Sequence, residues 1–154
     1  TYKEYIFKFI DIHPATNTSK FQINASADGG SNYNVTKTTT YFQAYHTESD
    51  SATALQYYAN RDLAQSTSAQ QLKDIGNTSD DSAAGILHLF DPSSTTFVKH
   101  FMSTNTGPTG EATQNLHHTF IGGYFNTTSA VDAVQFSMSS GNIDAGTIKM
   151  YGVT

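Results

Sequence analysis

Three residues in one irregular segment carry the side chains best suited to binding chemistry. Tyr57, Tyr58 and Arg61 lie within residues 48–68, where no clear helix or strand pattern is present. Tyrosine rings stack on the apolar faces of sugar rings, while arginine and asparagine groups hydrogen-bond to the sugar hydroxyls. Alternatively, the two tyrosines pack the segment onto a sheet or a neighbouring subunit. Tyr57, Tyr58 and Arg61 are the ligand-binding candidates, and the packing alternative stays open.

Six histidines could build a metal site. His117 and His118 are adjacent, so on a strand they point to opposite faces and cannot hold one ion together. If the turn at 91–94 closes a tight hairpin with opposite residues summing to 188, His88 faces His100 at about 5 Å. Such a pair would bind a metal or titrate together, or the two histidines would be half-exposed spacers. Because the sequence offers no third ligand, we expect no metal and no cofactor.

Motifs for catalysis are missing from the chain. The sequence has no Gly-x-Ser-x-Gly, no His-Glu-x-x-His and no phosphate-binding glycine loop. Ten of the 13 acidic residues are Asp, mostly at turn positions. A glycosidase needs two carboxyl groups about 5–9 Å apart, and the sequence excludes that for no particular pair. We predict no catalytic residue and a protein that is not an enzyme.

Composition excludes several classes of protein. The 154 residues carry only 8 Lys and Arg against 13 Asp and Glu, a net charge of −5. Nucleic-acid binding relies on clustered cations, so we expect no nucleic-acid partner. The absence of cysteine excludes disulfides, zinc fingers and thiol nucleophiles. No apolar run approaches the roughly 20 residues that span a bilayer, so we expect no membrane insertion.

Alternation of apolar and polar residues predicts that strands make up most of the chain, so any site would be built on strands and the loops between them. Thr, Tyr and Phe are frequent and strong helix formers are scarce. In the strand predicted at 2–13, two faces alternate, both partly apolar. One face carries Tyr5, Phe7 and Phe9, and the other carries Ile6, Lys8, Ile10 and Ile12. Further strands are predicted at 20–24, 32–47, 70–76, 85–90, 96–102, 116–126, 131–138 and 143–153, while 54–63 is ambiguous between helix, strand and loop.

Turn residues between these segments predict how the strands connect. The Asp-Gly-Gly step at 28–30 suits a tight hairpin, and Gly141 suits a second hairpin between 131–138 and 148–153. Gly122-Gly123 predicts a bulge or a close backbone approach, and Gly146 a bulge. The pattern predicts one domain over 1–154: an all-β, antiparallel two-sheet sandwich of jelly-roll type with about eight to ten strands.

The end of the chain carries a family resemblance. Residues 140–152 read Ser-Gly-Asn-Ile-Asp-Ala-Gly-Thr-Ile-Lys-Met-Tyr-Gly. This SGNI-x-x-GTI-x-x-YG segment resembles the closing strands of tailed-bacteriophage virion structural proteins. The resemblance implies a jelly-roll domain of a tail fibre, a spike tip or a capsid decoration subunit, often trimeric. These motifs encode fold rather than chemistry, so no site residue is implied.

The function expected from the sequence is therefore structural and adhesive. We expect a virion protein, belonging to a longer chain or larger assembly, that mediates host-surface glycan attachment or capsid stabilisation. Its partners would be other virion proteins and copies of itself, since the two apolar faces of the first strand favour a homotrimer. The alternative is a carbohydrate-binding module of a secreted glycan-active enzyme.

Overall fold

A computed structural model describes residues 2–110 and 115–154 as ten strands in two antiparallel sheets. The strands are β1 (Glu4–Pro14), β2 (Ser19–Ser26), β3 (Lys37–Thr47), β4 (Thr53–Tyr57), β5 (Gln70–Ile75), β6 (Ala83–Phe90), β7 (Lys99–Pro108), β8 (Asn115–Phe125), β9 (Ala133–Met138) and β10 (Ile143–Val153). The predicted all-β two-sheet sandwich is confirmed. In the described ranges no helix is long and apolar enough to cross a membrane.

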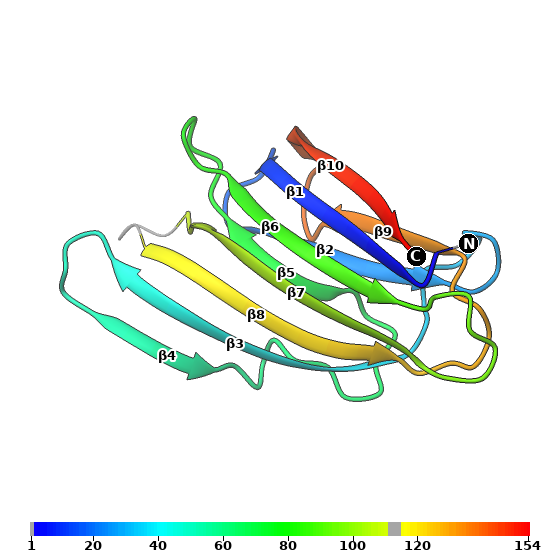
Figure 1. Ribbon diagram of the computed structural model, residues 1–154. Helices are drawn as coiled ribbons and strands as arrows, with labels where there is room; N and C mark the ends of the chain where they lie inside the picture. The colour runs from blue at the N-terminus through cyan, green and yellow to red at the C-terminus, as the bar shows by residue number, and fades with distance from the viewer. Residues whose placement is uncertain (1, 111–114) are drawn as a thin grey trace.

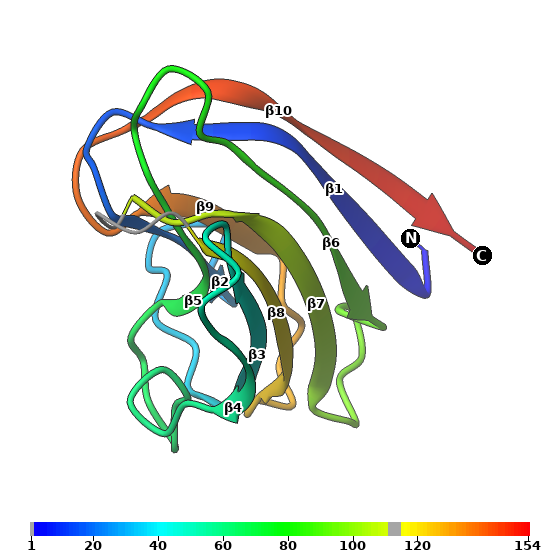
Figure 2. The ribbon, with the colours of Figure 1, turned by 90° about the vertical axis from the view of Figure 1, so that its left-hand side faces the viewer.

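The two sheets differ in size. The large sheet has the strand order β10-β1-β6-β7-β8-β3-β4, and the small sheet has the order β5-β2-β9. The large sheet lies in front of the small one in Figure 1, and it curves around it when seen from the side in Figure 2. The pairs β1·β10, β2·β9 and β3·β8 are nested in sequence and alternate between the sheets. This nesting agrees with the predicted jelly-roll type.

Alternation in β1 places its aromatic face inside. Phe7 and Phe9 are 5% and 3% exposed, whereas Ile10 on the other face is 38% exposed. Ile12, predicted on the same face as Ile10, is instead fully buried. The correction has a local cause: Asp11 has a positive φ of 51°, and the register with β6 and β10 shifts there. A bulge of this kind moves the following side chain to the opposite face.

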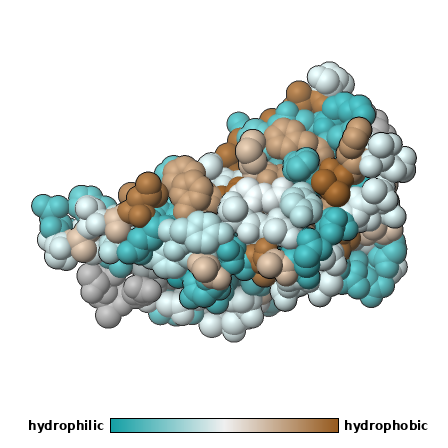
Figure 3. Space-filling model, turned by 90° about the horizontal axis from the view of Figure 1, so that it is seen from below, coloured by the Kyte–Doolittle hydropathy of each residue, from teal (hydrophilic) through white to brown (hydrophobic). Residues whose placement is uncertain are grey.

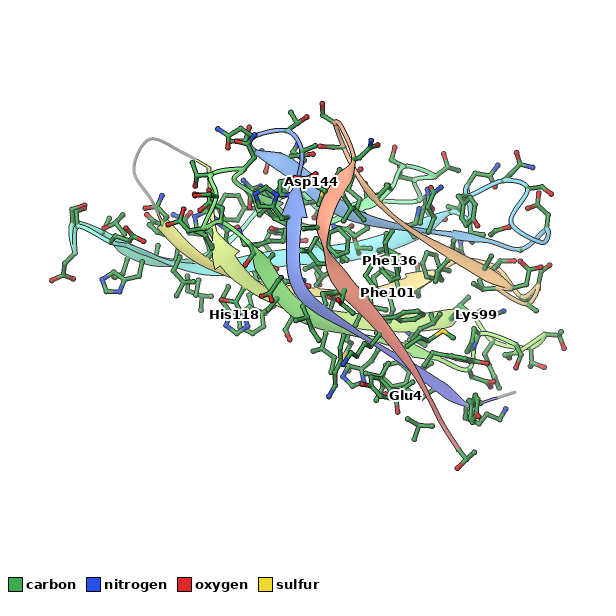
Figure 4. All side chains as sticks on the ribbon, turned by 90° about the horizontal axis from the view of Figure 1, so that it is seen from above. Glu4, Lys99, Phe101, His118, Phe136 and Asp144 are labelled. Carbon is green, nitrogen blue, oxygen red and sulfur yellow. The ribbon has the colours of Figure 1, made fainter. Side chains whose placement is uncertain are left out.

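The centre of the sandwich is an aromatic cluster contributed by both sheets. Phe7 and Phe9 from the large sheet meet Phe21 and Phe136 from the small one. Ring centroids in the cluster lie 5.0 to 5.8 Å apart, mostly edge to face. Figure 4 shows Phe136 and Phe101 between the two layers. Aromatic contacts of this geometry add to the burial of apolar area, so this cluster holds the sheets together.

The two hairpins predicted at the glycine turns, one at residues 28–30 and one at Gly141, are not hairpins in the structure. Gly29 and Gly141 have the positive φ values expected of them, 72° and 68°. However, β2 and β9 belong to the small sheet, whereas β3 and β10 belong to the large sheet. Both connections therefore cross between layers. Period-two patterning says which way side chains point but not which sheet a strand joins, so both predictions were wrong.

Two other glycine predictions concern bulges. Gly146 has a φ of 119° and lies at the shift in register between β10 and β1, which confirms the bulge there. Gly123 pairs with both β3 and β7 without a shift. A Cβ at Gly123 would lie 2.6 Å from Thr39 Cγ2 and 3.0 Å from Phe101 Cζ. The Gly122-Gly123 step therefore serves a close approach rather than a bulge.

The large sheet keeps an exposed outer face. On it, Phe42 stacks on Phe120 at 5.0 Å, while Met102 and Leu116 are 55% and 51% exposed. Seen from below, hydrophobic side chains form small separate groups among hydrophilic ones (Figure 3). Isolated exposed apolar side chains are ordinary on protein surfaces.

Lysines are buried at three positions of the sandwich. Lys37, Lys73 and Lys99 are fully buried. Lys37 Nζ donates to Ser68 O at 2.7 Å, and Lys99 Nζ donates to Phe97 O and Thr127 O at 2.9 and 3.0 Å. Lys37 and Lys99 thus tie connecting segments to the large sheet, whereas Lys73 joins β5 to β7 through Pro108 O at 3.2 Å.

In the wild-type protein we expect the free energy of unfolding to increase between pH 7 and pH 10, and we expect Lys37→Met to reduce this increase. Burial lowers the pKa of Lys37 from 10.5 to about 8. Between these values the unfolded chain binds more protons than the folded chain, so the free energy of unfolding rises with pH. Below about pH 8 both states are protonated, and the full cost of burying the charge remains.

Urea unfolding at pH 7, 8, 9 and 10 measures this effect. Because burial also lowers the pKa of Lys73 to about 8, the wild-type protein should gain about 2–5 kcal/mol across the series. Lys37→Met should gain less, and the exposed control Lys20→Met should match the wild type. Equal slopes in Lys37→Met and wild type would contradict the prediction.

Candidate functional site

A polar cleft of about 530 Å³ lies where β3, β4 and β8 meet the segment after β4. Its lining residues are Gln43, Tyr45, Thr47, Ser51, Ala52, Gln56, Tyr58, Arg61, Asn115 and His117. This volume lies within the range of small-molecule sites. The lining combines aromatic rings, amides, hydroxyls and one guanidinium.

Strand alternation places the floor of the cleft. Gln43 and Tyr45 point to the inner side of β3, and cross-strand pairing puts Gln56 opposite Gln43 and His117 opposite Tyr45. The Tyr45 and His117 rings lie 5.9 Å apart. Asn115 Oδ1 is buried and, among the described residues, has no hydrogen-bond partner. The floor is therefore an ordered array of ring and amide groups.

The chain turns back over this floor after β4. Tyr58 N donates to Tyr41 O at 2.9 Å, and Arg61 N donates to Tyr58 O at 3.0 Å. This turn brings the Arg61 guanidinium over two rings, 4.9 Å from the Tyr58 centroid and 5.6 Å from the Tyr41 centroid. Cation–π contacts of this kind hold the arginine and Tyr58 in a fixed relation.

A buried ionic network underlies the cleft. Asp74 on β5 pairs with Arg61 Nη2 at 3.3 Å, with Lys73 Nζ at 3.5 Å and with His117 Nδ1 at 3.8 Å. Arg61 Nη1 also donates to Gln43 Oε1 at 3.1 Å. Two bonds to the guanidinium from different strands fix its plane, as an arginine fork allows. Asp74 is therefore the residue that positions Arg61.

Burial alone would raise the pKa of Asp74. The hydrogen bond with His117 and the charges of Lys73 and Arg61 outweigh burial and hold this pKa well below its usual range. Burial, with the Asp74 charge, raises the pKa of Tyr41 to about 12. At neutral pH the network is thus an ionised Asp74 bound to Arg61, beneath a protonated Tyr41.

The structure brings together two of the three residues proposed from the sequence. Tyr58 and Arg61 line the cleft. Tyr57 ends β4 on the other side of the strand, where its hydroxyl donates to Asp62 Oδ2 at 2.5 Å. Tyr57 is 55% exposed and is not among the lining residues.

Several cleft residues had no local signal in the sequence. Gln43 and Tyr45 come from β3, and Asn115 and His117 come from β8, far along the chain. Only the pairing of β3 with β8 brings them together. Alternation of β3 alone would have placed Gln43 and Tyr45 on one face.

The predicted pairing of His88 with His100 is wrong. β7 begins at Lys99, so the connection after β6 is longer than a tight turn, and opposite residues sum to 190. His88 lies opposite Met102 and contacts Glu4 Oε1 at 2.5 Å, while His100 lies opposite Tyr124. In the described part of the chain no three His, Asp or Glu side chains converge as a metal site.

His117 and His118 do point to opposite faces, as predicted. His117 is 5% exposed inside the cleft. His118 is exposed on the outer face and stacks on Phe120 with centroids 4.4 Å apart. Figure 4 shows His118 on that outer side.

Comparison with protein-family models, with curated proteins and with solved structures finds no match in any of the three. The class defined by fold and site is a two-sheet β-sandwich with a polar, tyrosine-lined cleft. The chemistry of the cleft therefore rests on its own geometry.

Proposed function

We propose that this chain is a non-enzymatic attachment domain of a virion, of the tail-fibre or spike type, which binds a host-surface glycan in the polar cleft. The observation that carries the proposal is the arrangement of Tyr45, Tyr58 and Arg61 around one cleft. The placement on a virion rests on the resemblance of residues 140–152 to the closing strands of phage structural proteins.

Sugars match the groups that the cleft offers. A pyranose ring has apolar C–H faces, which the Tyr58 and Tyr45 rings can cover, and hydroxyl groups at its rim. Gln56 and Asn115 supply amide groups for those hydroxyls, while the buried Gln43 holds Arg61 from below. Because Asp74 already holds Arg61 in place, little ordering entropy is lost when a ligand binds.

The cleft favours binding over hydrolysis. Glycoside hydrolysis commonly needs two carboxyl groups that flank the scissile bond. None of the residues described as lining the cleft is Asp or Glu. Asp74 lies beneath the lining, engaged by Arg61 and Lys73.

A glycan array with matched tyrosine variants tests the proposal. We expect the wild-type protein to bind at least one glycan and Tyr58→Ala to weaken that binding about fivefold or more, because one stacked ring contributes about 1 kcal/mol or more. Tyr57→Ala is the control, because Tyr57 is adjacent to Tyr58 in sequence but its ring lies outside the cleft. No binding on a broad array, or equal losses in both variants, would contradict the proposal.

Binding to whole cells and to particles separates the remaining roles. A fibre or spike domain should bind host cells, and Tyr58→Ala should weaken that binding. A capsid decoration protein would bind capsids and ignore cells. A carbohydrate-binding module of a secreted enzyme would bind the purified polysaccharide that its parent degrades, so polysaccharide binding without cell binding would favour that alternative.

A further inference from the structure

β10 forms an uncovered edge of the large sheet. Among the described strands it pairs with β1 alone (Figure 1). Every residue after Ile143 in this strand is exposed. Figure 2 shows β10 at the end of the large sheet, curving away from the small sheet toward the C-terminus. The outer side of β10 therefore presents a row of unpaired backbone groups.

Both faces of this strand carry exposed apolar side chains. Met150 and Ile148 lie opposite Phe7 and Phe9 on the inner face and are 63% and 37% exposed. Tyr151 on the outer face is 45% exposed. Met150 also borders an apolar cleft of about 410 Å³ whose walls include Phe7, Leu89 and Val134. The edge offers hydrogen bonds and apolar contacts together, which is what an added strand uses.

Beyond the bulge at Gly146, the β10 edge has few of the features that normally prevent an edge strand from pairing with another chain. From 147 to 153 the register with β1 is uninterrupted, and the stretch contains no proline and a single charge, Lys149. Natural edges are usually interrupted by charges, prolines or bulges. Lys149 already lies opposite Lys8, so a strand that added here would have to avoid a third cation at that position.

We propose that β10 of a second copy of this chain pairs with β10 in antiparallel fashion, about a two-fold axis at Met150. The regular stretch 147–153 is symmetric about Met150, so all of it can pair. This register sets Lys149 opposite the Tyr151 ring of the second copy, whereas an axis at Lys149 would set the two ammoniums opposite each other. The two-fold pairing also uses the same edge of both copies, so the assembly ends at a dimer. Pairing of β10 with the opposite edge strand β4 of a second copy would leave a free edge at each end and build an open-ended chain of copies.

A dimer of this kind differs from the homotrimer expected from the sequence. That expectation rested on the two apolar faces of β1, and one of them, with Phe7 and Phe9, is covered by the small sheet. The surplus apolar surface at this end of the sheet belongs to β10. The dimer does not depend on the glycan proposal, because the polar cleft is formed by β3, β4 and β8 at the other end of the sheet.

Cysteine cross-linking tests the register directly, because the chain has no cysteine of its own. In the proposed pairing the two Met150 Cβ atoms lie about 5 Å apart. Met150→Cys should therefore form a disulfide-linked dimer on mild oxidation, seen in non-reducing electrophoresis. Leu55→Cys, at a 70% exposed position on the opposite edge strand, is the control and should stay monomeric in the gel. Equal cross-linking of both variants, or none in Met150→Cys, would overturn the proposed register.

Sedimentation equilibrium supplies the second readout. The wild-type protein should show twice the chain mass of 16.7 kDa at high micromolar concentration. Met150→Glu brings two carboxylates together at the axis and should restore the single chain mass, while Leu55→Glu should remain dimeric. A monomeric or trimeric wild type, or a dimeric Met150→Glu, would overturn the proposal. Glycan binding by a monomer would leave the proposed function intact and refute the dimer alone.

Discussion

Replacement of Asp74 by alanine is expected to lower the free energy of unfolding by about 3–5 kcal/mol and to abolish ligand binding in the polar cleft. Removing the carboxylate leaves Lys73, which is fully buried, and the Arg61 guanidinium without their shared counter-charge. An unpaired buried cation is far less stable than a paired one. Arg61 would also lose the contact that fixes its plane over Tyr58.

Chemical denaturation of wild type and variant measures this loss. Asp80→Ala is the control, because Asp80 lies in an exposed turn where it accepts a hydrogen bond from Thr78. If Asp74→Ala fails to fold, Asp74→Asn keeps the side-chain volume and should still lose stability and weaken glycan binding. An Asp74→Asn variant as stable as wild type would refute the role given to the network.

The pH dependence of the same variant follows from the depressed pKa of Asp74. The carboxylate contributes its stability above the ordinary Asp value of 3.8, and that contribution is lost as the pH falls through the lower pKa of the folded state. Acid titration should therefore destabilise the wild type more than Asp74→Asn. Parallel acid profiles would show that Asp74 is not stabilised by its partners.

Phe21→Ala is expected to lower the free energy of unfolding by about 3–5 kcal/mol. Phe21 is 1% exposed, and its ring lies 5.0 Å from Phe9 and 5.8 Å from Phe136. It is the small sheet's central contribution to the aromatic cluster, so its loss opens a cavity between the layers. Neighbouring rings held by two sheets can close such a cavity only in part.

Thermal and urea unfolding give the size of this effect. Phe97→Ala removes the same group from a 70% exposed position and should change stability by less than about 0.5 kcal/mol. Phe21→Leu keeps most of the volume and should lie between the two. A Phe21→Ala variant no less stable than Phe97→Ala would mean that the aromatic cluster does not hold the sheets together.

Strand positions and facing directions were readable from the sequence because they depend on neighbouring residues. The alternation of Phe7 and Phe9 with Ile6 and Ile10 predicted two faces of β1, and the structure buries the one with Phe7 and Phe9. Ile12 escaped this reasoning because one residue, Asp11, adopts a positive φ and reverses the alternation after it. A single backbone torsion has no signature in the hydrophobic pattern.

Pairing partners were the weaker part of the prediction. The register of β6 with β7 depended on where β7 begins. The numbers of opposite residues sum to 190 rather than to the expected 188, so His88 does not lie opposite His100. The connections after β2 and β9 cross between layers although their glycines have the expected φ values. Turn residues specify local torsions, whereas the sheet that receives the next strand is selected by burial of whole faces.

The sequence by itself determined the all-β class, the two alternating faces of β1, the opposed directions of His117 and His118, and the segment that holds Tyr58 and Arg61. Tertiary structure alone decided that Arg61 meets Asp74 and that Tyr58 and Tyr45 line one cleft while Tyr57 lies outside it. The physical reason is range: side-chain alternation acts over two residues, but the cleft requires β3, β4, β5 and β8 to pack together. Such packing is a property of the whole hydrophobic core and cannot be read from any one segment.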